Sequence, residues 1–475
     1  MKAKRNQKSK QIIVAVIVVL LLHLIISNLK CRPIISGDTL VNLQSGIIER
    51  REDITEFNVP EGIKYIGAFA FYGCTSLENV TLPDTVKSIR WEAFCNCINL
   101  EEINLPESLE IIEGEAFRNC KSLKNINLPQ EITMIEDETF SDCTSLETIN
   151  FSRNLDEIGV GAFSNCQSLK EVVLPDNVTI IGYQAFHECT NLEKVKLSKN
   201  IKFISEEVFE GTAFIGKIKA DENGCIYLEN VLLKSLPLKE QVKIKEGTRV
   251  IAGGAFEDNK IIKKVSLPNE LIGIGDRGFY NCENLEDIDL TSDIESIGIG
   301  AFVNTKYLRR LSEDEYGCKY TENILLTYTD KDISKIKIKD GTRLIAGNAF
   351  YGIDSIKEVY IPNSVRYIGI QAFESCHNLE KVEFEEGSRL ETIERDIFSG
   401  SGLRVINLPR SLKKISHYAF GLCDFESIRI PENVEYIEIW AFIACLSLKR
   451  LELPKSLKGK FYWISDKPKP KIVFY

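Results

Sequence analysis

A phenylalanine recurs through most of this chain at a spacing of 23 residues, and an isoleucine stands five residues before every one of these phenylalanines. These fifteen marker phenylalanines are Phe71, Phe94, Phe117, Phe140, Phe163, Phe186, Phe209, Phe256, Phe279, Phe302, Phe350, Phe373, Phe398, Phe420 and Phe442. A period of about 20 to 50 residues is typical of solenoids, in which each repeat buries its apolar face against the next one. The repeat therefore argues against the three separate globular domains that a length of 475 residues would otherwise suggest.

A typical repeat occupies residues 101–123 and reads EEINLPESLEIIEGEAFRNCKSL. Its first apolar residues alternate with polar ones, which is typical of a strand with one buried face. A proline then ends backbone pairing and turns the chain. A second apolar pair and an Ala-Phe step follow, and they combine small and large side chains as a close-packed interior requires. The pattern predicts a stack of coils that share one hydrophobic spine.

Two longer gaps interrupt the period, of 47 residues between Phe209 and Phe256 and of 48 residues between Phe302 and Phe350. Their contents are alike, DENGCIYLENVLLKS in the first and DEYGCKYTENILLTY in the second, which indicates a copied block. The dipeptide Asn223-Gly224 favours a two-residue hairpin turn. We predict hairpin inserts near 215–240 and 309–334, which serve either as structural joints or as protruding contact surfaces.

The N-terminus has the features of a targeting segment. Residues 1–10 hold five basic and no acidic side chains, and an apolar run follows at 12–26. Such a basic flank stays cytoplasmic, so the remainder of the chain is predicted to lie outside the cytoplasm. Residues 1–30 are predicted to be a signal anchor in which 11–29 cross the membrane, or a secretory signal that is cleaved. Both interpretations give an extracytoplasmic, cell-surface or secreted protein.

The remaining boundaries follow from where the repeat begins and ends. Residues 31–53 are predicted to be an N-terminal cap or linker, 54–454 the solenoid, and 455–475 a C-terminal cap, because the ends of a stack need covering. The chain has 59 basic and 69 acidic residues, and its net charge is −10. Nucleic acid is therefore not an expected partner, since a protein that tracks phosphates carries basic patches. The oligomeric state stays open.

Ten cysteines stand three residues after a marker phenylalanine, so they form a column in the stack. They are Cys74, Cys97, Cys120, Cys143, Cys166, Cys189, Cys282, Cys376, Cys423 and Cys445. Neighbouring coils lie about 4.8 Å apart, which is longer than the Cβ separation that a disulfide prefers. We predict buried free thiols here, and local packing in place of metal or redox chemistry for Cys95, Cys225 and Cys318. Whether Cys225 and Cys318 pair with another thiol stays open.

Outward positions of the repeat supply the candidate contact residues. Four successive coils carry a polar residue at one strand position, where stacked side chains can bond one another or contact a protein or glycan ligand. Two aromatic residues occupy a segment that also tolerates polar ones, and exposed aromatic side chains are favoured in interfaces. The predicted contact residues are Thr81, Asn104, Asn127, Asn150, Trp91 and Tyr183.

The sequence offers little support for an enzyme. The chain has four histidines, and they are scattered, so that a Ser/His or Cys/His arrangement is not indicated. The phosphate-binding motif G-x-x-x-x-G-K-[ST] and the zinc motif H-E-x-x-H are absent. We predict no catalytic residue, no metal and no cofactor.

The pattern LPxxVxxIxxxAFxxCxxL, repeated across residues 54–454, resembles the bacterial leucine-rich repeats of the BspA-like surface proteins. The resemblance implies an α/β-type leucine-rich repeat solenoid: a single elongated right-handed stack of short parallel strands, mostly β and loop with short helical turns. It also implies a non-enzymatic surface protein that binds or adheres to an extracellular protein or polysaccharide. The alternative is a structural spacer or membrane-tethered partner protein in the envelope of the producing cell.

Overall fold

The computed structural model describes residues 31–36, 39–44, 54–438, 440–458, 461 and 470–475, so the predicted signal anchor at 1–30 lies outside the described residues. The chain divides into two compact units, and the division falls between Ile218 and Lys219. Both units are stacks of short coils whose strands pair in parallel with those of neighbouring coils. Very little of the described chain is helical. The predicted class, a leucine-rich repeat solenoid with short parallel strands, is confirmed.

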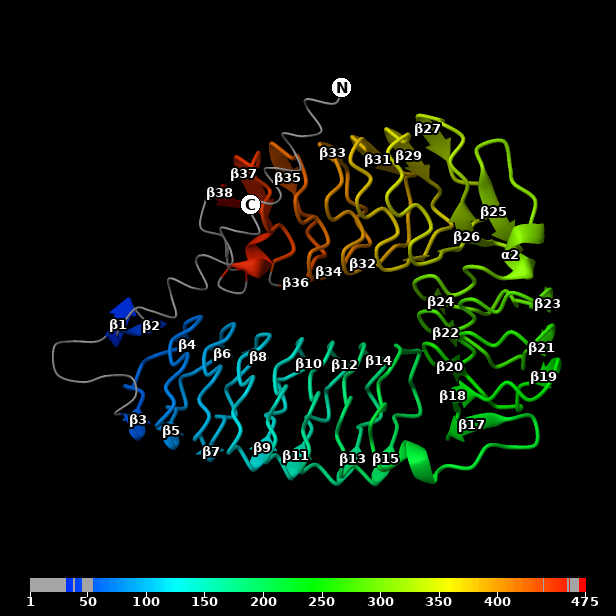
Figure 1. Ribbon diagram of the computed structural model, residues 1–475. Helices are drawn as coiled ribbons and strands as arrows, with labels where there is room; N and C mark the ends of the chain where they lie inside the picture. The colour runs from blue at the N-terminus through cyan, green and yellow to red at the C-terminus, as the bar shows by residue number, and fades with distance from the viewer. Residues whose placement is uncertain (1–30, 37–38, 45–53, 439, 459–460, 462–469) are drawn as a thin grey trace, which may run out of the picture. The chain divides into compact units, whose positions relative to one another are not determined.

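The strands of successive coils pair in two ladders. Ladder A consists of the strands formed by the alternating segment before the proline, and ladder B consists of the strands that contain the marker isoleucine. Ladder A of unit 1 consists of β3 (Glu56–Asn58), β5 (Asn79–Thr81), β7 (Glu102–Ile103), β9 (Asn125–Asn127), β11 (Thr148–Asn150), β13 (Glu171–Val173) and β15 (Lys194–Lys196). Ladder B consists of β4 (Tyr65–Ile66), β6 (Ser88–Ile89), β8 (Ile111–Ile112), β10 (Met134–Ile135), β12 (Glu157–Ile158), β14 (Ile180–Ile181) and β16 (Phe203–Ile204), preceded by the antiparallel pair β1 (Cys31–Ser36) and β2 (Thr39–Gln44). The two ladders run along opposite edges of unit 1 (Figure 1).

Unit 2 repeats this arrangement. Its ladder A consists of β19 (Gln241–Lys243), β21 (Lys264–Ser266), β23 (Asp287–Ile288), β27 (Lys335–Lys337), β29 (Glu358–Ile361), β31 (Lys381–Phe384), β33 (Val405–Ile406), β35 (Ser427–Arg429), β37 (Arg450–Leu453) and β38 (Lys471–Phe474). Its ladder B consists of β20 (Val250–Ile251), β22 (Gly273–Ile274), β24 (Ser296–Ile297), β28 (Leu344–Ile345), β30 (Tyr367–Ile368), β32 (Thr392–Ile393), β34 (Lys414–Ile415) and β36 (Tyr436–Ile437). The hairpins are β17 (Cys225–Leu228) with β18 (Val231–Ser235) and β25 (Cys318–Thr321) with β26 (Ile324–Tyr328). The helical turns are η2 (Ile215–Lys217) in unit 1, and α2 (Lys306–Arg310) and η3 (Lys455–Leu457) in unit 2.

The marker phenylalanines form the core, and their rings stack face to face from coil to coil. In unit 1, Phe163 and Phe186 lie with their ring centroids 5.2 Å apart at an interplanar angle of 5°. In unit 2 the stacked rings form two runs, because Tyr307 tilts against Phe302 at the end of the first run and Tyr328 tilts against Phe350 at the start of the second. The predicted stacking of the marker rings is therefore observed, but the rings form one run in unit 1 and two runs in unit 2, so the prediction of one continuous spine is wrong.

A left-handed backbone residue lets each coil turn back on itself after the marker phenylalanine. Asn96, Asn119, Asp142 and Asn165 stand two residues after the phenylalanine in successive coils, and their φ angles lie between 59° and 62°. Asparagine and aspartate tolerate this region better than other side chains except glycine. Gly73 takes the same position in the coil before Asn96, with φ of 67°. Backbone geometry therefore explains the asparagine, aspartate and glycine residues at this position, while Glu188, Ser375, Leu422 and Ala444 take the same conformation in other coils.

The cysteine column is buried as predicted, and all thirteen cysteines whose side chains the structure describes are free. Nine of the thiols in the column donate a hydrogen bond of 2.9–3.2 Å to the carbonyl oxygen of the marker phenylalanine in the preceding coil. Burial raises the pKa of the Cys189 thiol to about 12. The column thus satisfies a backbone carbonyl in each coil, and its thiols stay protonated and unreactive.

The thirteen described thiols are expected to resist a thiol reagent in the folded protein and to react with it once the chain is unfolded, because burial blocks access and disfavours the thiolate. The measurement is a titration of reactive thiols without reductant, before and after addition of denaturant. A count below about eight reactive thiols in the unfolded chain would indicate disulfides and would contradict the parallel spacing of the column.

The hairpin turns differ from the sequence prediction. The first hairpin turns at Glu229-Asn230, between β17 and β18, and Glu229 has φ of 53°. The predicted turn residues Asn223 and Gly224 instead precede β17, where Asp221 Oδ1 accepts hydrogen bonds from the backbone N–H groups of Asn223 and Cys225, both at 2.8 Å. The prediction that Asn223-Gly224 forms the hairpin turn is therefore wrong. These two residues form a separate bend before β17, which the Asp221 side chain organises.

The second hairpin lies between two hydrophobic cores of unit 2. In β26, Ile324 and Leu326 pack into the core of the preceding coils, whereas Leu325 and Tyr328 pack into the core of the following coils. In β28, which pairs with β26 in parallel, Leu344 and Ile345 divide in the same way. A strand buried on both faces needs consecutive apolar residues rather than alternating ones. The segments ILLTY and LIA meet this requirement, so the second hairpin and β28 pack against both cores.

Candidate functional site

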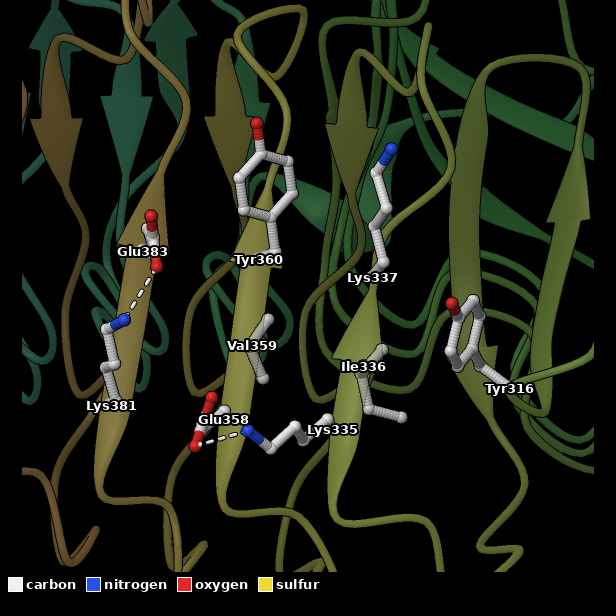
Figure 2. Close-up of a pocket in the computed structure, with 9 residues that line it drawn as sticks. All are labelled: Tyr316, Lys335, Ile336, Lys337, Glu358, Val359, Tyr360, Lys381 and Glu383. Atoms are coloured by element: carbon white, nitrogen blue, oxygen red, sulfur yellow. Dashed lines mark hydrogen bonds and ion pairs between the residues drawn. The ribbon is translucent and has the colours of Figure 1, made fainter.

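The candidate site is a groove on the outer face of ladder A in unit 2, with a volume of about 270 Å³. Its lining comes from the three neighbouring strands β27, β29 and β31, and from the segment just before β25 (Figure 2). The lining residues are Tyr316, Lys335, Ile336, Lys337, Glu358, Val359, Tyr360, Lys381 and Glu383. The groove therefore runs across the parallel strands.

Strand alternation places the polar side chains of the groove outward. Val359 is buried in the core at the centre of β29, while its neighbours Glu358 and Tyr360 are half-buried at the surface. Parallel pairing sets Lys337 of β27 beside Tyr360 of β29, and Tyr360 beside Glu383 of β31. Because alternate residues face opposite sides of a strand, these outward side chains form a continuous polar and aromatic surface.

The charges of the groove are paired within the protein. Lys335 Nζ lies 3.0 Å from a carboxylate oxygen of Glu358, and Lys381 Nζ lies 2.7 Å from one of Glu383. Lys337 Nζ lies 3.3 Å from a carboxylate oxygen of Asp340 and 5.7 Å from the centre of the Tyr360 ring. These exposed pairs add little stability. They do cancel charge locally, so the groove presents hydrogen-bonding groups without a strong field of either sign.

Tyr316 is held at the groove by the insert that precedes β25. Asp314 Oδ1 accepts hydrogen bonds from three successive backbone N–H groups, those of Tyr316 at 3.0 Å, Gly317 at 2.9 Å and Cys318 at 2.8 Å. The bend requires Gly317, whose φ is 102°. The Tyr316 ring packs partly against the core of the following coils. Tyr316 and Tyr360 lie on either side of Lys337 (Figure 2).

Four of the predicted contact residues lie along ladder A of unit 1. Thr81, Asn127 and Asn150 lie in β5, β9 and β11, Asn104 directly follows β7, and all four are exposed. Asn150 Nδ2 donates to Asn127 Oδ1 at 2.5 Å, which is the expected bond between stacked amides. These residues belong to the same ladder type as the groove, but they are in the other unit.

The two predicted aromatic contact residues lie at the other edge of unit 1, beside ladder B. Trp91 and Tyr183 each stand two residues after a ladder B strand, and both are half-buried. The Trp91 ring meets Phe69 edge to face with centroids 4.8 Å apart, and the Tyr183 hydroxyl lies 3.2 Å from a carboxylate oxygen of Glu207. The structure therefore does not bring the six predicted residues into one site.

Sequence reasoning missed Tyr316 and Tyr360. A signal for them was present, because the copied block holds Asn223 and Ser266 at the corresponding places. Comparison of the two copies would have singled out the positions where polar residues are replaced by aromatic ones.

A second hollow, of about 470 Å³, lies in unit 1 beside the turns that follow the marker phenylalanines, and Tyr72, Glu92, Cys95 and Arg118 are among the residues that line it. Glu92 is 1% exposed, and burial, followed by the charge of Glu115, raises the pKa of the Glu92 carboxyl to about 8. Arg118 pairs at 2.7 Å with Glu115 instead. The Glu92 carboxyl is therefore held mainly in its neutral form at pH 7.

Replacement of Glu92 by glutamine is expected to stabilise the protein at high pH. The pKa of Glu92 is higher in the folded protein than its usual value of 4.5, so the stability that the protonated form provides is lost as the pH rises from about 4.5 to 8. Glu92→Gln should match the wild type near pH 4.5 and gain about 4 to 5 kcal/mol near pH 8.5. Gln184 and Gln371 already occupy this repeat position with positive φ, so glutamine fits the backbone.

The measurement is urea unfolding of both proteins across this pH range. The control is Glu131→Gln, which removes an exposed carboxylate that does not line this hollow and should give no such gain at high pH. If the difference in unfolding free energy between Glu92→Gln and the wild type did not change with pH, the pKa of Glu92 would not be raised in the folded protein.

Within the described parts of the chain, no group of three or more histidine, cysteine, aspartate or glutamate side chains is arranged to hold a metal ion. None of the helices among the described residues has the length and apolar character needed to span a lipid bilayer.

The paired ladders, the 23-residue coil and the stacked phenylalanine core define the class of the protein as a leucine-rich repeat solenoid. A family model described as BspA type Leucine rich repeat region (6 copies) matches residues 43–170, 111–234, 227–340 and 325–449. These matches cover most of the chain, and the chain belongs to this family.

Several solved structures are similar to the chain. A leucine rich cell surface protein from Faecalibacterium prausnitzii A2-165 is 23% identical over 74% of this chain and 92% of that one, with a TM-score of 0.33. A leucine-rich repeat protein from Bacteroides ovatus ATCC 8483 is 24% identical over 92% and 95%, with a TM-score of 0.28. The pneumococcal vaccine antigen PcpA is 18% identical over 93% and 95%, with a TM-score of 0.33. No curated protein shows significant sequence similarity to the chain.

Proposed function

We propose that this protein is a non-enzymatic, surface-displayed binding protein that contacts an extracellular protein or glycan through the outer face of ladder A. The observation that carries the proposal is the groove across β27, β29 and β31, which Tyr316 and Tyr360 line together with two lysine–carboxylate pairs. Aromatic side chains with a polar end are favoured at binding surfaces because they combine contact area with hydrogen bonding.

The mechanism requires no chemistry and no movement of the backbone. Ladder A holds the outward side chains on strands that are paired on both sides at β29 and β31, with a buried residue such as Val359 beneath them. A rigid surface loses little conformational entropy on binding, so contact area converts more efficiently into affinity. The cell-surface location, reached through an anchor at 11–29 or after signal cleavage, belongs to the same proposal.

The test is a binding screen of the purified full-length protein against extracellular proteins and glycans. The variant Tyr316→Ala/Tyr360→Ala should weaken the saturable binding of the wild type by about tenfold or more, since truncating two central contact residues costs over about 1.4 kcal/mol. The control is Tyr351→Ala, which removes a 49% exposed aromatic ring outside the groove.

Equal binding by the wild type and the groove variant would place the contact surface elsewhere. The second hypothesis, a structural spacer or membrane-tethered partner in the producing cell's envelope, predicts another outcome. The protein would then show no saturable binding to any extracellular ligand and would co-purify with envelope components.

A further inference from the structure

The copied block of unit 2 contains two versions of the same scaffold. In the first version Asp221 organises the bend before β17, and Tyr227 OH accepts a hydrogen bond of 3.1 Å from the backbone N–H of Lys245. In the second version Asp314 organises the bend before β25, and Tyr320 OH accepts one of 3.2 Å from the backbone N–H of Lys339. The backbone frame on which the groove is built is therefore present twice.

The two versions differ where the groove has its tyrosines. Lys243 lies beside Ser266 in the first version, and Lys337 lies beside Tyr360 in the second. Asn223 takes the place of Tyr316, and its Nδ2 donates to the carbonyl oxygen of Lys243 at 3.3 Å. The second version thus adds two aromatic rings to a frame that holds together without them. Their role is not to form the hairpin, because the first hairpin forms with asparagine and serine.

The arrangement of the groove favours an uncharged ligand that contacts the side chains of the groove and not the backbone of its strands. Each lysine of the groove has a carboxylate partner at 2.7–3.3 Å, so a charged ligand would have to compete with existing pairs. Both edges of β29 and β31 are occupied by neighbouring strands, so their backbone groups are not open to an added peptide strand. Since strands lie about 4.8 Å apart, two rings on either side of β27 are separated by about two strand spacings.

We propose that the groove binds a neutral oligosaccharide, with Tyr316 and Tyr360 as the specificity-determining residues. The proposal rests on the binding function proposed above and specifies its ligand. The apolar C–H faces of two sugar units stack on the two rings, and the hydroxyl groups bond the Lys335–Glu358 and Lys381–Glu383 pairs, which offer donors and acceptors side by side.

The experiment is titration calorimetry of the full-length protein with neutral hexasaccharides of glucose, mannose and N-acetylglucosamine. At least one should bind saturably, and Tyr316→Ala and Tyr360→Ala should each weaken its binding by about tenfold, whereas Tyr360→Phe keeps the ring and should bind within about threefold of wild type. Raising the salt from about 50 to 500 mM should change the affinity by less than about twofold, because no charge is neutralised on binding.

The first version of the scaffold provides a gain-of-function test. The first version has Gln241, Lys264, Asp287 and Asp289 at the places of Lys335, Glu358, Lys381 and Glu383, so both the rings and the lysine–carboxylate pairs must be copied. The variant Asn223→Tyr/Gln241→Lys/Lys264→Glu/Ser266→Tyr/Asp287→Lys/Asp289→Glu should give the protein a second binding site and raise the stoichiometry from one sugar to two. The control has the same four charge substitutions with Asn223→Ala/Ser266→Ala, and it should leave the stoichiometry at one. Thermal unfolding of each variant shows whether the fold is retained.

The outcomes separate the ligand from the function. If the hexasaccharides do not bind but a polypeptide binds and is lost in the tyrosine variants, the groove is a protein-binding site and the sugar proposal is wrong. Sugar binding that is unaffected by both tyrosine variants would also overturn it, as would a tenfold loss of affinity at high salt. Absence of any saturable ligand contradicts the proposed function itself.

Discussion

Phe163→Ala is expected to lower the free energy of unfolding by about 3 to 5 kcal/mol, because it opens a cavity in the middle of a stack that cannot close around it. The Phe163 ring is fully buried. Its centroid lies 5.4 Å from that of Phe140 and 5.2 Å from that of Phe186, and Phe151 meets it edge to face at 5.9 Å. Backbone hydrogen bonds to the neighbouring coils hold the walls apart.

The measurement is urea or thermal unfolding of the purified protein. Phe163→Leu is the matched control, since it keeps most of the buried apolar volume and should lose markedly less stability than the alanine variant. A loss below about 1 kcal/mol for Phe163→Ala would mean that the ring does not lie in the core, and the stacked phenylalanine core described above would be wrong.

Leu344→Ala is expected to cost about 3 kcal/mol, although the residues at this repeat position in several regular coils, such as Met134 and Ile180, are only half-buried. Leu344 precedes the ladder B isoleucine and is fully buried, because β28 lies between two cores of unit 2. Removal of its side chain leaves a cavity on the face toward the preceding coils, while Ile345 continues to pack on the other face.

The control is Met134→Ala, the same position in a regular coil of unit 1, where the side chain is only half-buried. It should cost about 1 kcal/mol or less, since a half-exposed side chain loses less contact area. Similar losses for the two variants in chemical unfolding would show that the insert does not bury β28 on both faces.

The internal order of a coil could be predicted from its residues because each feature acts locally or between identical neighbours. Val80 alternates with two polar residues and is buried between two exposed ones in β5. The thiol of Cys97 meets the carbonyl of Phe71 at 3.1 Å because the same turn recurs 23 residues apart. A local pattern that recurs every 23 residues therefore predicts a contact between neighbouring coils.

The hairpin turn and the groove could not be predicted in the same way. Asn223-Gly224 has the residue preference of a turn, but two bends lie close together there and only the pairing of β17 with β18 shows which one closes the hairpin. Tyr316 reaches the groove from outside the repeat, across a bend held by Asp314. No period relates Tyr316 to Tyr360, so their proximity depends on how the insert packs.

The sequence by itself determined the coil: its 23-residue length, the buried isoleucine and phenylalanine column, the proline corner and the protonated thiols. Only the tertiary structure decided where the stack of rings is divided in unit 2, and which outward side chains meet. The physical reason is that stacking contacts recur between identical neighbours and leave a period in the sequence. The contacts of Tyr316 in the second insert and of Leu344 in the strand β28 beside it leave no such period, because they depend on cores that form from distant segments.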